Sequence, residues 1–127
     1  MPRVSVIIPT HNQAEAVCRA VDSVLAQTFR DFEIIVADDA STDHTAQALA
    51  RYEGSMRCLH RTTNGGVGAA RNDGIRAGSS EFVCFLDSDD LYLPRRLEAA
   101  VAFLDHNPTF HAVYTDCRIL WSLLHHG

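Results

Sequence analysis

The sequence predicts an α/β domain built on a mostly parallel, doubly wound, Rossmann-like sheet. Short apolar runs alternate along the chain with amphipathic helical patterns, and these runs are apolar almost throughout rather than at every second position. Strands buried on both faces have this near-continuous pattern, and strand–helix alternation gives parallel sheets covered by helices. With 127 residues, 46% of them hydrophobic, the chain can bury one core, so we expect one domain over residues 1–127.

Five short apolar runs are the predicted strands. They are rich in β-branched residues and end at polar or turn-forming positions. In chain order they are residues 4–8 (VSVII), 32–37 (FEIIVA), 56–60 (MRCLH), 81–86 (EFVCFL) and 111–116 (HAVYTD). The first run must stop at Pro9, because proline has no N–H to donate to a central ladder.

Helical patterns lie between these runs. Apolar residues at helical spacing from Val17 to Leu25 are typical of an amphipathic helix. We expect it to begin near Gln13, with Asn12 as its cap. Three further helices are predicted: one after Ser41 or Thr42 that carries Ala46, Leu49 and Ala50, one at residues 69–77, and one from Pro94 to Asn107. Residues 118–127 (RILWSLLHHG) stay apolar nearly to the end, so we expect a fragment of a longer chain.

The composition excludes several classes of function. A formal net charge of −5 disfavours a nucleic-acid partner. All 11 basic residues are Arg, which excludes mechanisms that need a catalytic or phosphate-binding lysine. The four cysteines form no C-x-x-C pair, and no apolar run has the length of a membrane span or the form of a secretory signal. We therefore expect reduced thiols and a cytoplasmic location, which includes the inner face of the cell membrane.

Small, polar and acidic residues follow each of the first four predicted strands. The four segments are PTHN (9–12), DDAS (38–41), the loop through NGGVGAARN (64–72) and DSDD (87–90). In open α/β sheets ligands bind outside the carboxyl ends of the strands, so these segments share one crevice. Thr10 and Asn12 can hydrogen-bond a ligand there or cap a helix. The coincidence of four segments predicts a ligand site more strongly than any one of them.

Three carboxylates follow the fourth predicted strand: Asp87, Asp89 and Asp90. Hard carboxylate oxygens suit Mg²⁺ or Mn²⁺, which usually keep waters and share their shell with substrate phosphates. The alternative is a solvated loop in which an Asp caps the next helix. Repulsion among three carboxylates beside an apolar strand favours the cation, with Asp90 as the structural member of the three.

Two other segments offer groups for a nucleotide. Asp38 and Asp39 can accept hydrogen bonds from ribose hydroxyls or a base N–H, or they can simply open the next helix. The Gly-rich loop around Gly66, with Arg71 one turn into the following helix, suits a diphosphate. Turns need glycine in any case, so this loop is weak support when taken alone.

Taken in order and at this spacing, VSVIIPTHN, FEIIVADDASTD, NGGVGAARNDGI and FVCFLDSDD resemble the nucleotide-sugar-binding half of the inverting family 2 glycosyltransferases, which have the GT-A fold. The resemblance covers Val4 to about Asp116. Any one motif is weak, and four in register are specific. The resemblance implies that residues 1–127 are the donor domain of a glycosyltransferase, truncated before its acceptor half.

The resemblance implies roles for the first two segments. Thr10 and Asn12 fall in the first donor-site loop, where His11 stands in place of the more usual Tyr. Asp39 matches the acid that contacts the nucleobase, commonly uracil. Asp38 falls in the same acidic pair, and we assign it to the donor site as well.

Roles also follow for the later segments. Arg71 matches the basic residue near the donor's phosphates, and Gly66 lies in the loop before it. Asp87 and Asp89 match the D-x-D signature. Asp89 corresponds to the direct metal ligand, and Asp87 lies nearer the ribose or the metal's waters.

The implied chemistry is transfer of a sugar from a nucleoside-diphosphate sugar, UDP-sugar favoured, to an acceptor hydroxyl with inversion. Mg²⁺ or Mn²⁺ would neutralise charge on the departing diphosphate. A general base must take the acceptor's proton, and in the family it lies in the acceptor half, so we expect it beyond residue 127 and assign no catalytic residue. We expect these residues to bind donor and to transfer little or no sugar. The implied acceptor is a glycan or is lipid-linked, which is compatible with peripheral membrane association.

Three other functions compete with this interpretation. A dinucleotide-dependent oxidoreductase would need G-x-G-x-x-G after the first strand, where the chain has PTHNQ. A phosphoacceptor signalling domain would, by resemblance, have acids after the first strand and a lysine after the fifth, and this chain has neither. A non-catalytic nucleotide-binding module stays open, because sequence beyond residue 127 would distinguish it.

Overall fold

A four-stranded parallel sheet forms the centre of the computed structural model, which describes residues 1–119. The strands are β1 (Val4–Thr10), β2 (Phe32–Asp38), β3 (Arg57–His60) and β4 (Phe82–Phe85). They lie in the order β3-β2-β1-β4, and every pairing is parallel. After β1, the chain adds β2 and then β3 toward one edge of the sheet. β4 then pairs with the opposite side of β1. The predicted α/β class and parallel sheet are confirmed.

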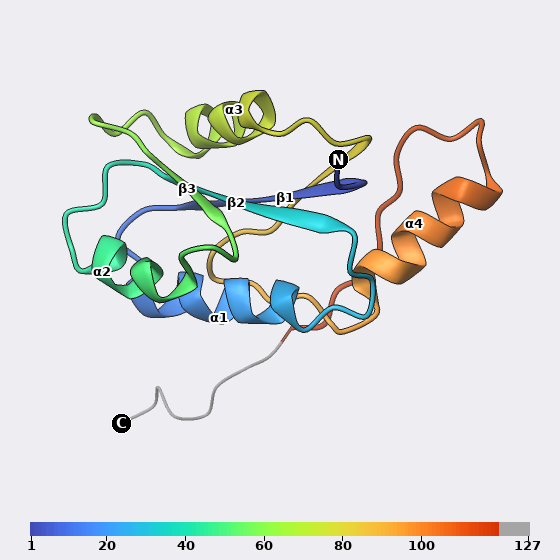
Figure 1. Cartoon of the computed structure of the whole chain (residues 1–127), viewed down its shortest axis with the longest axis horizontal. Coiled ribbons are helices and arrows are strands. Elements are labelled where there is room, and N and C mark those ends of the chain that lie inside the picture. Colours follow the sequence, from blue (N-terminus) through green and yellow to red (C-terminus); the bar gives the residue numbers. More distant parts are fainter. Residues whose placement is uncertain (120–127) are drawn as a thin grey trace.

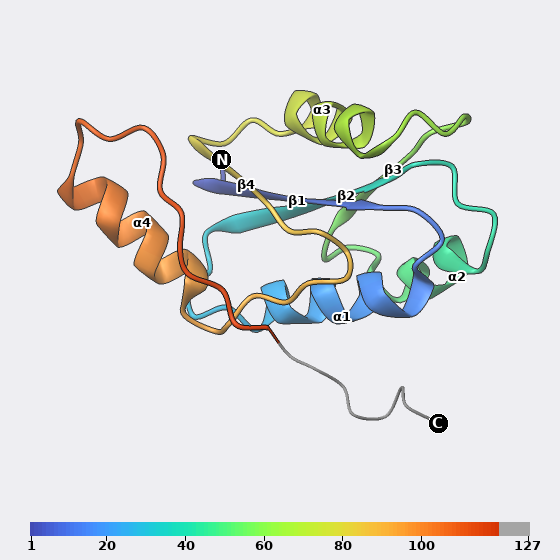
Figure 2. The same cartoon turned by 180° about the vertical axis from the view of Figure 1, so that it is seen from behind.

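Helices cover both faces of this sheet. They are α1 (Ala14–Leu25), α2 (Thr45–Leu49), α3 (Val67–Ala77) and α4 (Arg96–His106). Figure 1 shows α3 above the sheet and α1 and α2 below it, and Figure 2 shows the same layers from behind, with α4 at one end of the molecule. No helix within residues 1–119 combines the length and apolarity that crossing a bilayer requires.

The core lies between the sheet and its two helical layers. All seven residues of β1 are buried, as the near-continuous apolar run predicts. β1 continues through Pro9 to Thr10, so the predicted stop at Pro9 is wrong. Proline is tolerated there because the pairing with β4 ends at Ile7, and Pro9 pairs only with Ala37 of β2.

Val6 and Ile8 pack with α1 residues such as Val17 and Val21 on one face. On the other face α3 approaches β1 so closely that a Cβ on Gly74 would lie 2.4 Å from Cγ2 of Ile7. Glycine at this position is therefore a packing requirement.

Helix α2 begins later than predicted, at Thr45. The Asp43 carboxylate accepts the Thr45 backbone N–H at 3.0 Å. Asp43 thus has the capping role that the sequence assigned to Ser41 or Thr42, because an Asp side chain bonds the backbone N–H two residues on. The helix is short, and residues 50–52 continue it as a 3₁₀ turn.

The predicted fifth strand at residues 111–116 is wrong. After α4 the Phe110 N–H donates to the Asn107 carbonyl at 3.0 Å, and the rings of Phe103 and Phe110 lie 5.8 Å apart. This turn directs the chain back along α4 rather than to the sheet (Figure 1). A strand-like composition forms a strand only where a neighbouring strand offers its backbone groups. The apolar end of the chain, residues 120–127, lies outside the described residues.

Candidate functional site

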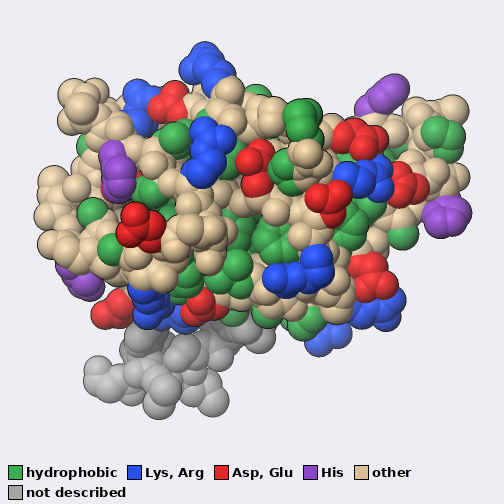
Figure 3. Space-filling view, viewed as in Figure 1, with side chains coloured by type: hydrophobic (Ala, Val, Ile, Leu, Met, Phe, Trp, Pro, Cys, Tyr) green, Lys and Arg blue, Asp and Glu red, His purple; other side chains and the backbone are tan. Residues whose placement is uncertain are grey.

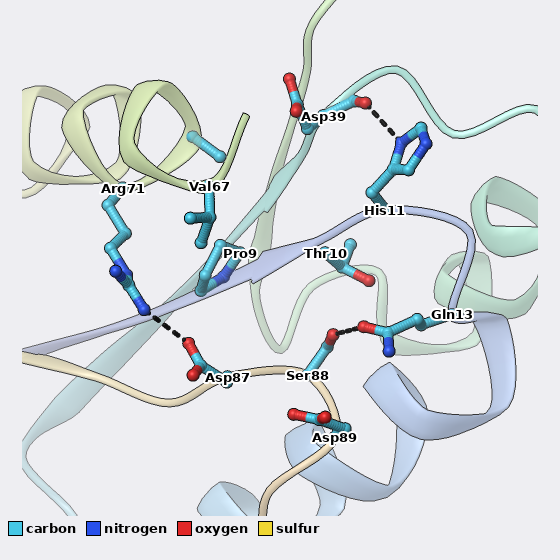
Figure 4. Close-up of a pocket in the computed structure, with 11 residues that line it drawn as sticks. Pro9, Thr10, His11, Gln13, Asp39, Val67, Arg71, Asp87, Ser88 and Asp89 are labelled. Carbon is cyan, nitrogen blue, oxygen red and sulfur yellow. Dashed lines mark hydrogen bonds and ion pairs between the residues drawn. The ribbon is translucent and has the colours of Figure 1, made fainter. Parts of the chain in front are cut away.

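A pocket of about 400 Å³ opens at the carboxyl ends of β1, β2 and β4. It lies where the strand order reverses around β1, which is the usual ligand crevice of an open α/β sheet. Figure 4 shows side chains from three separate segments and α3 gathered around it. Five of the residues that the sequence singles out line it: Thr10, Asp39, Arg71, Asp87 and Asp89. Three do not: Asn12, Asp38 and Gly66.

Asp39 directly follows β2, and its carboxylate holds the Gly-rich loop. One oxygen accepts the Gly65 N–H at 2.8 Å, and the other accepts the Gly66 N–H at 2.7 Å. Arg61 Nε lies 3.1 Å from Oδ1 and forms an ion pair. Burial alone would raise the pKa of Asp39, but the two amide hydrogen bonds and Arg61 outweigh it and lower the pKa below its usual 3.8. Asp39 is therefore ionised at neutral pH.

Asp38, the other member of the predicted acidic pair, is buried outside the pocket. Its Oδ1 accepts the Ser41 N–H at 3.1 Å, and its Oδ2 lies 3.1 Å from Nδ1 of His60 on β3. Successive side chains of a strand point to opposite faces, which separates it from its neighbour Asp39. The structure thus gives Asp38 contacts that join β2 to β3, and only Asp39 reaches the pocket.

Asn12 joins two loops instead of capping α1, so that prediction is wrong. It has a left-handed backbone conformation with φ of 51°, which Asn tolerates better than most residues. Its side-chain oxygen accepts the backbone N–H groups of Thr42 at 2.7 Å and Asp43 at 3.2 Å. Gln13 occupies the N-cap position of α1 and makes no side-chain capping bond. Asn12 therefore fixes the segment after β1 against the segment after β2.

His11 forms one wall of the pocket, and its ring is held at both nitrogens. Nδ1 lies 2.7 Å from the Asp39 carbonyl oxygen, and Nε2 lies 3.3 Å from the side-chain nitrogens of Asn12 and Asn64. The tautomer with a proton on Nδ1 fits this network, since Nδ1 then donates to the carbonyl and Nε2 accepts from the amides. The ring is consequently fixed beside Asp39 (Figure 4).

Thr10 presents a buried hydroxyl to the pocket. The residue is only 4% exposed, and its Oγ1 makes no hydrogen bond within residues 1–119. A buried hydroxyl without a partner costs about 1–3 kcal/mol. A ligand with a hydrogen-bonding group at this position would remove that cost.

Arg71 and Asp87 face one another across the pocket (Figure 4). Nη2 of Arg71, in the second turn of α3, lies 2.8 Å from Oδ1 of Asp87. Asp89 also lines the pocket and is exposed. Asp90 lies outside the lining, and its N–H donates to the Asp87 carbonyl at 2.9 Å. Burial, together with the charges of Asp89 and Asp87, raises the pKa of Asp90.

The carboxylates of Asp87 and Asp89 suit a divalent cation that arrives with a phosphate-bearing ligand. No three His, Cys, Asp or Glu side chains converge anywhere in the described part of the chain. Mg²⁺ commonly takes one or two carboxylates and completes its shell with substrate phosphates and water. Asp87 and Asp89 supply two hard oxygen donors on one side of the pocket, so the donor set fits such an ion.

Two polar residues of the pocket were not singled out by the sequence. Gln13 and Ser88 both line the pocket, and the Ser88 hydroxyl donates to Oε1 of Gln13. Neither side chain is charged, and 75 positions separate them in the sequence. Ser88 lies inside the DSDD segment and Gln13 directly follows the PTHN segment, and these places are the only sequence signal that could have drawn attention to them.

Comparison with known proteins determines the family. The sequence model of glycosyl transferase family 2 matches residues 5–119. The chain belongs to glycosyl transferase family 2. The GT-A fold implied by the sequence motifs is confirmed by similar solved structures, which share the parallel sheet with flanking helices.

Relatives of this family 2 chain include an uncharacterized glycosyltransferase of Rickettsia typhi, 41% identical over 104 residues. That match covers 82% of this chain and 32% of the relative. Poly(ribitol-phosphate) β-N-acetylglucosaminyltransferase TarS of Staphylococcus aureus is 36% identical over 112 residues, which are 84% of this chain and 20% of TarS. The chain thus spans at most about a third of the length of these two relatives.

Solved structures agree with the family 2 assignment. TarS 1-349 in complex with UDP-GlcNAc superposes with a TM-score of 0.79 at 36% identity, covering 84% of this chain and 32% of that one. The mannosyltransferase PcManGT from Pyrobaculum calidifontis, in complex with GDP-Man and Mn²⁺, gives a TM-score of 0.74 at 33% identity, covering 81% and 32%. Both structures hold a nucleotide sugar.

Proposed function

We propose that the protein is a glycosyltransferase and that this chain binds its nucleoside-diphosphate-sugar donor in the pocket at the ends of β1, β2 and β4. One observation carries the proposal: a single pocket of this family 2 chain brings together five side chains with complementary chemistry. They are a buried acid, a buried hydroxyl, an arginine and two exposed or half-exposed carboxylates. These are Asp39, Thr10, Arg71, Asp87 and Asp89. Residues 1–127 would then be the donor domain.

The nucleobase is assigned to the end of the pocket formed by Asp39, Thr10 and His11. A carboxylate oxygen accepts about two hydrogen bonds, so each Asp39 oxygen has capacity beyond its loop amide. Arg61 approaches Oδ1, which leaves Oδ2 as the better acceptor for a base N–H. The imidazole of His11 offers a flat surface beside it, in the place where the family more usually has Tyr.

The diphosphate is assigned to the end formed by Arg71, Asp87 and Asp89. Arg71 can donate several N–H groups to phosphate oxygens. A divalent cation held by Asp87 and Asp89 would neutralise negative charge on the leaving diphosphate as a Lewis acid. Arg71 would then stabilise the same charge from the α3 side of the pocket, while the two carboxylates orient the donor.

We favour a UDP-sugar over a GDP-sugar. Uracil has a single imide N–H, which one open carboxylate oxygen can accept. Guanine presents an N1–H and an amino group side by side and would need both Asp39 oxygens to be open. Support also comes from TarS, whose complex with UDP-GlcNAc is slightly more similar to this chain than the GDP-Man complex of PcManGT.

Transfer with inversion to a glycan or lipid-linked acceptor completes the proposal, together with a cytoplasmic location. No residue among 1–119 is assigned as the general base. The location of the base beyond residue 127 stays a prediction. Weak sugar transfer by residues 1–127 alone is also a prediction. A nucleic-acid partner is not part of the proposal. On the face shown in Figure 3, basic and acidic side chains are interspersed, and the net charge is −5.

The test is calorimetric titration of the chain with UDP, GDP and dTDP, with and without Mn²⁺. We expect UDP to bind most tightly and Mn²⁺ to strengthen its binding. Asp89→Asn should remove the Mn²⁺ effect and leave the metal-free affinity nearly unchanged. Absence of binding by all three nucleotides would overturn the proposal, and metal-independent binding that Asp89→Asn leaves unaltered would remove the metal assignment.

A further inference from the structure

Helix α1 contributes hydrogen-bonding side chains to the segment that carries Asp87 and Asp89. We call residues 86–95, between β4 and α4, the acidic loop. Three polar residues of α1 and its ends bond this loop or the start of α4: Gln13 to the Ser88 hydroxyl, Ser23 to the Tyr92 N–H, and Gln27 to the Leu93 carbonyl and the Leu97 N–H. The acidic loop is therefore shaped by α1 through side chains.

The two contacts farther from the pocket anchor the end of the loop. Gln27 is only 2% exposed, and both ends of its amide are bonded, at 2.7 Å to the Leu93 carbonyl and 3.0 Å to the Leu97 N–H. Ser23 accepts the Tyr92 N–H at 3.2 Å. These contacts explain the path of the chain into α4, and they leave the pocket end of the loop to be held by something else.

The contact between Gln13 and Ser88 lies at that pocket end. Ser88 stands between Asp87 and Asp89 and is 3% exposed, although the carboxylates on either side are accessible. The Gln13 carbonyl accepts the Val17 N–H at 2.9 Å, so the backbone of Gln13 is fixed by α1. Figure 4 shows Gln13 reaching from the start of α1 to Ser88, with Asp87 and Asp89 on either side.

Backbone bonds alone leave this turn weakly held. The Leu86 N–H donates to the Ile7 carbonyl at 3.0 Å and ends the β4 pairing, and the Asp90 N–H closes a turn onto the Asp87 carbonyl at 2.9 Å. Between these two bonds, two side chains contact the rest of the fold: Asp87 pairs with Arg71 of α3 at 2.8 Å, and the Ser88 hydroxyl donates to Gln13. The ion pair with Arg71 is screened by water, so the buried Ser88 contact is the one that fixes the turn. Two carboxylates so close together also repel one another until a cation binds.

We propose that Gln13 is a positioning residue for the acidic pair. By accepting the Ser88 hydroxyl it fixes the turn so that Asp87 and Asp89 both face the pocket and can hold a divalent cation together with the donor diphosphate. The inference rests on the proposed function, since it concerns the same pocket. Gln13 itself would touch neither the cation nor the reacting atoms.

The expected effect follows from the way in which outer hydrogen bonds act on metal ligands. Removing a group that orients a metal-binding side chain typically weakens metal affinity about 10–100-fold. Gln13→Ala and Ser88→Ala each remove one side of the contact. If the hydrogen bond between Gln13 and Ser88 supports Mn²⁺ binding, the double variant should lose no more Mn²⁺ affinity than either single variant. The second substitution then removes no further interaction.

The experiment measures Mn²⁺ affinity of the 127-residue chain in the presence of saturating UDP, and UDP affinity in the absence of metal. The variants are Gln13→Ala, Ser88→Ala and the double variant, with Gln47→Ala as the matched control. Gln47 is an exposed glutamine on α2, away from the pocket lining. Gln13→Glu keeps the acceptor oxygen and should restore Mn²⁺ affinity toward that of the unsubstituted chain.

The expected result is a loss of Mn²⁺ affinity of about tenfold in both single variants and in the double variant, with a much smaller change in metal-free UDP affinity. The Gln47→Ala control should keep both affinities of the unsubstituted chain. Amide hydrogen exchange at residues 87–90 should become faster in the same variants. Unaltered Mn²⁺ affinity in Gln13→Ala, or additive losses in the double variant, would overturn the inference while leaving the proposed function intact. Failure of the unsubstituted chain to bind UDP and Mn²⁺ would remove both.

Discussion

Nη2 of Arg71 lies 2.8 Å from Oδ1 of Asp87, and this ion pair joins α3 to the acidic loop across the pocket. The two side chains are 37% and 48% exposed, so water screens the attraction. Ion pairs of this kind contribute about 0.2–1 kcal/mol to folding. The pair is therefore of little use to stability, and it places a cation and an anion where a charged ligand would compete for both.

Arg71→Met should weaken binding of UDP with little effect on folding. Loss of a charge-assisted hydrogen bond to phosphate costs about 1.5–3 kcal/mol, which corresponds to roughly 10–100-fold in Kd. Calorimetry of UDP binding and urea unfolding measure the two quantities. Arg76→Met is the control on the same helix, since Arg76 is 76% exposed and pairs only loosely with Asp73 at 3.6 Å. Equal loss of UDP affinity in both variants would contradict a specific role for Arg71.

Removal of divalent metal should weaken UDP binding, and Asp89→Asn should reproduce most of that loss in the presence of Mn²⁺. The reason is that Asp89 and Asp87 are the lining carboxylates at the end of the pocket assigned to the diphosphate. We expect at least a tenfold change in Kd, about 1.4 kcal/mol. Asp90→Asn serves as the control, because Asp90 lies outside the lining. A metal effect that survives Asp89→Asn and disappears in Asp90→Asn would show that the wrong carboxylate has been assigned.

Asp39→Asn should destabilise the fold at neutral pH and much less in acid. The pKa of Asp39 is lowered in the folded state, so its stabilising contribution is present above the unfolded-state value of about 3.9 and is lost as the pH falls through the folded-state value. Asparagine keeps one acceptor oxygen but turns an amino group toward a loop N–H. We expect a cost of about 2 kcal/mol at pH 7.

Urea unfolding at pH 7, 5 and 3 checks this dependence on Asp39. The difference between the unsubstituted chain and Asp39→Asn should be largest at pH 7 and pH 5 and smaller at pH 3. Asp31→Asn is the control, because Asp31 is exposed and its carboxylate makes no hydrogen bond within residues 1–119. A difference that grows toward pH 3 would have the wrong sign and would contradict the lowered pKa.

Gly74→Ala should destabilise the fold, whereas Gly68→Ala in the same helix should stabilise it. A Cβ at position 74 would lie 2.4 Å from Cγ2 of Ile7, and overpacking of this kind costs about 1–3 kcal/mol. A Cβ at position 68 meets nothing within 4 Å, and alanine is favoured over glycine in a helix by roughly 0.5–1 kcal/mol. Chemical denaturation of the two variants gives the signs directly. A Gly74→Ala variant as stable as the unsubstituted chain would show that α3 is not packed on β1 as described.

The elements that were predicted correctly are those whose signal is local. β1 and β2 are runs of buried β-branched residues, and their burial on both faces requires apolar side chains at successive positions, which the sequence displays directly. The run at residues 111–116 has a similar composition but lies along α4. Its outcome depended on the turn closed by Phe110 and Asn107 and on the contact between Phe103 and Phe110, which composition does not reveal.

The sequence by itself determined the α/β class, the polar segments after the strands, and the family to which those motifs belong, because strand burial and motif spacing are properties of consecutive residues. Only the tertiary structure decided which of two adjacent acids faces the pocket. Asp39 does and Asp38 does not, since neighbouring positions at the end of a strand point in opposite directions. The contact of Gln13 with Ser88 was likewise invisible in the sequence, because folding alone brings together two neutral side chains 75 residues apart.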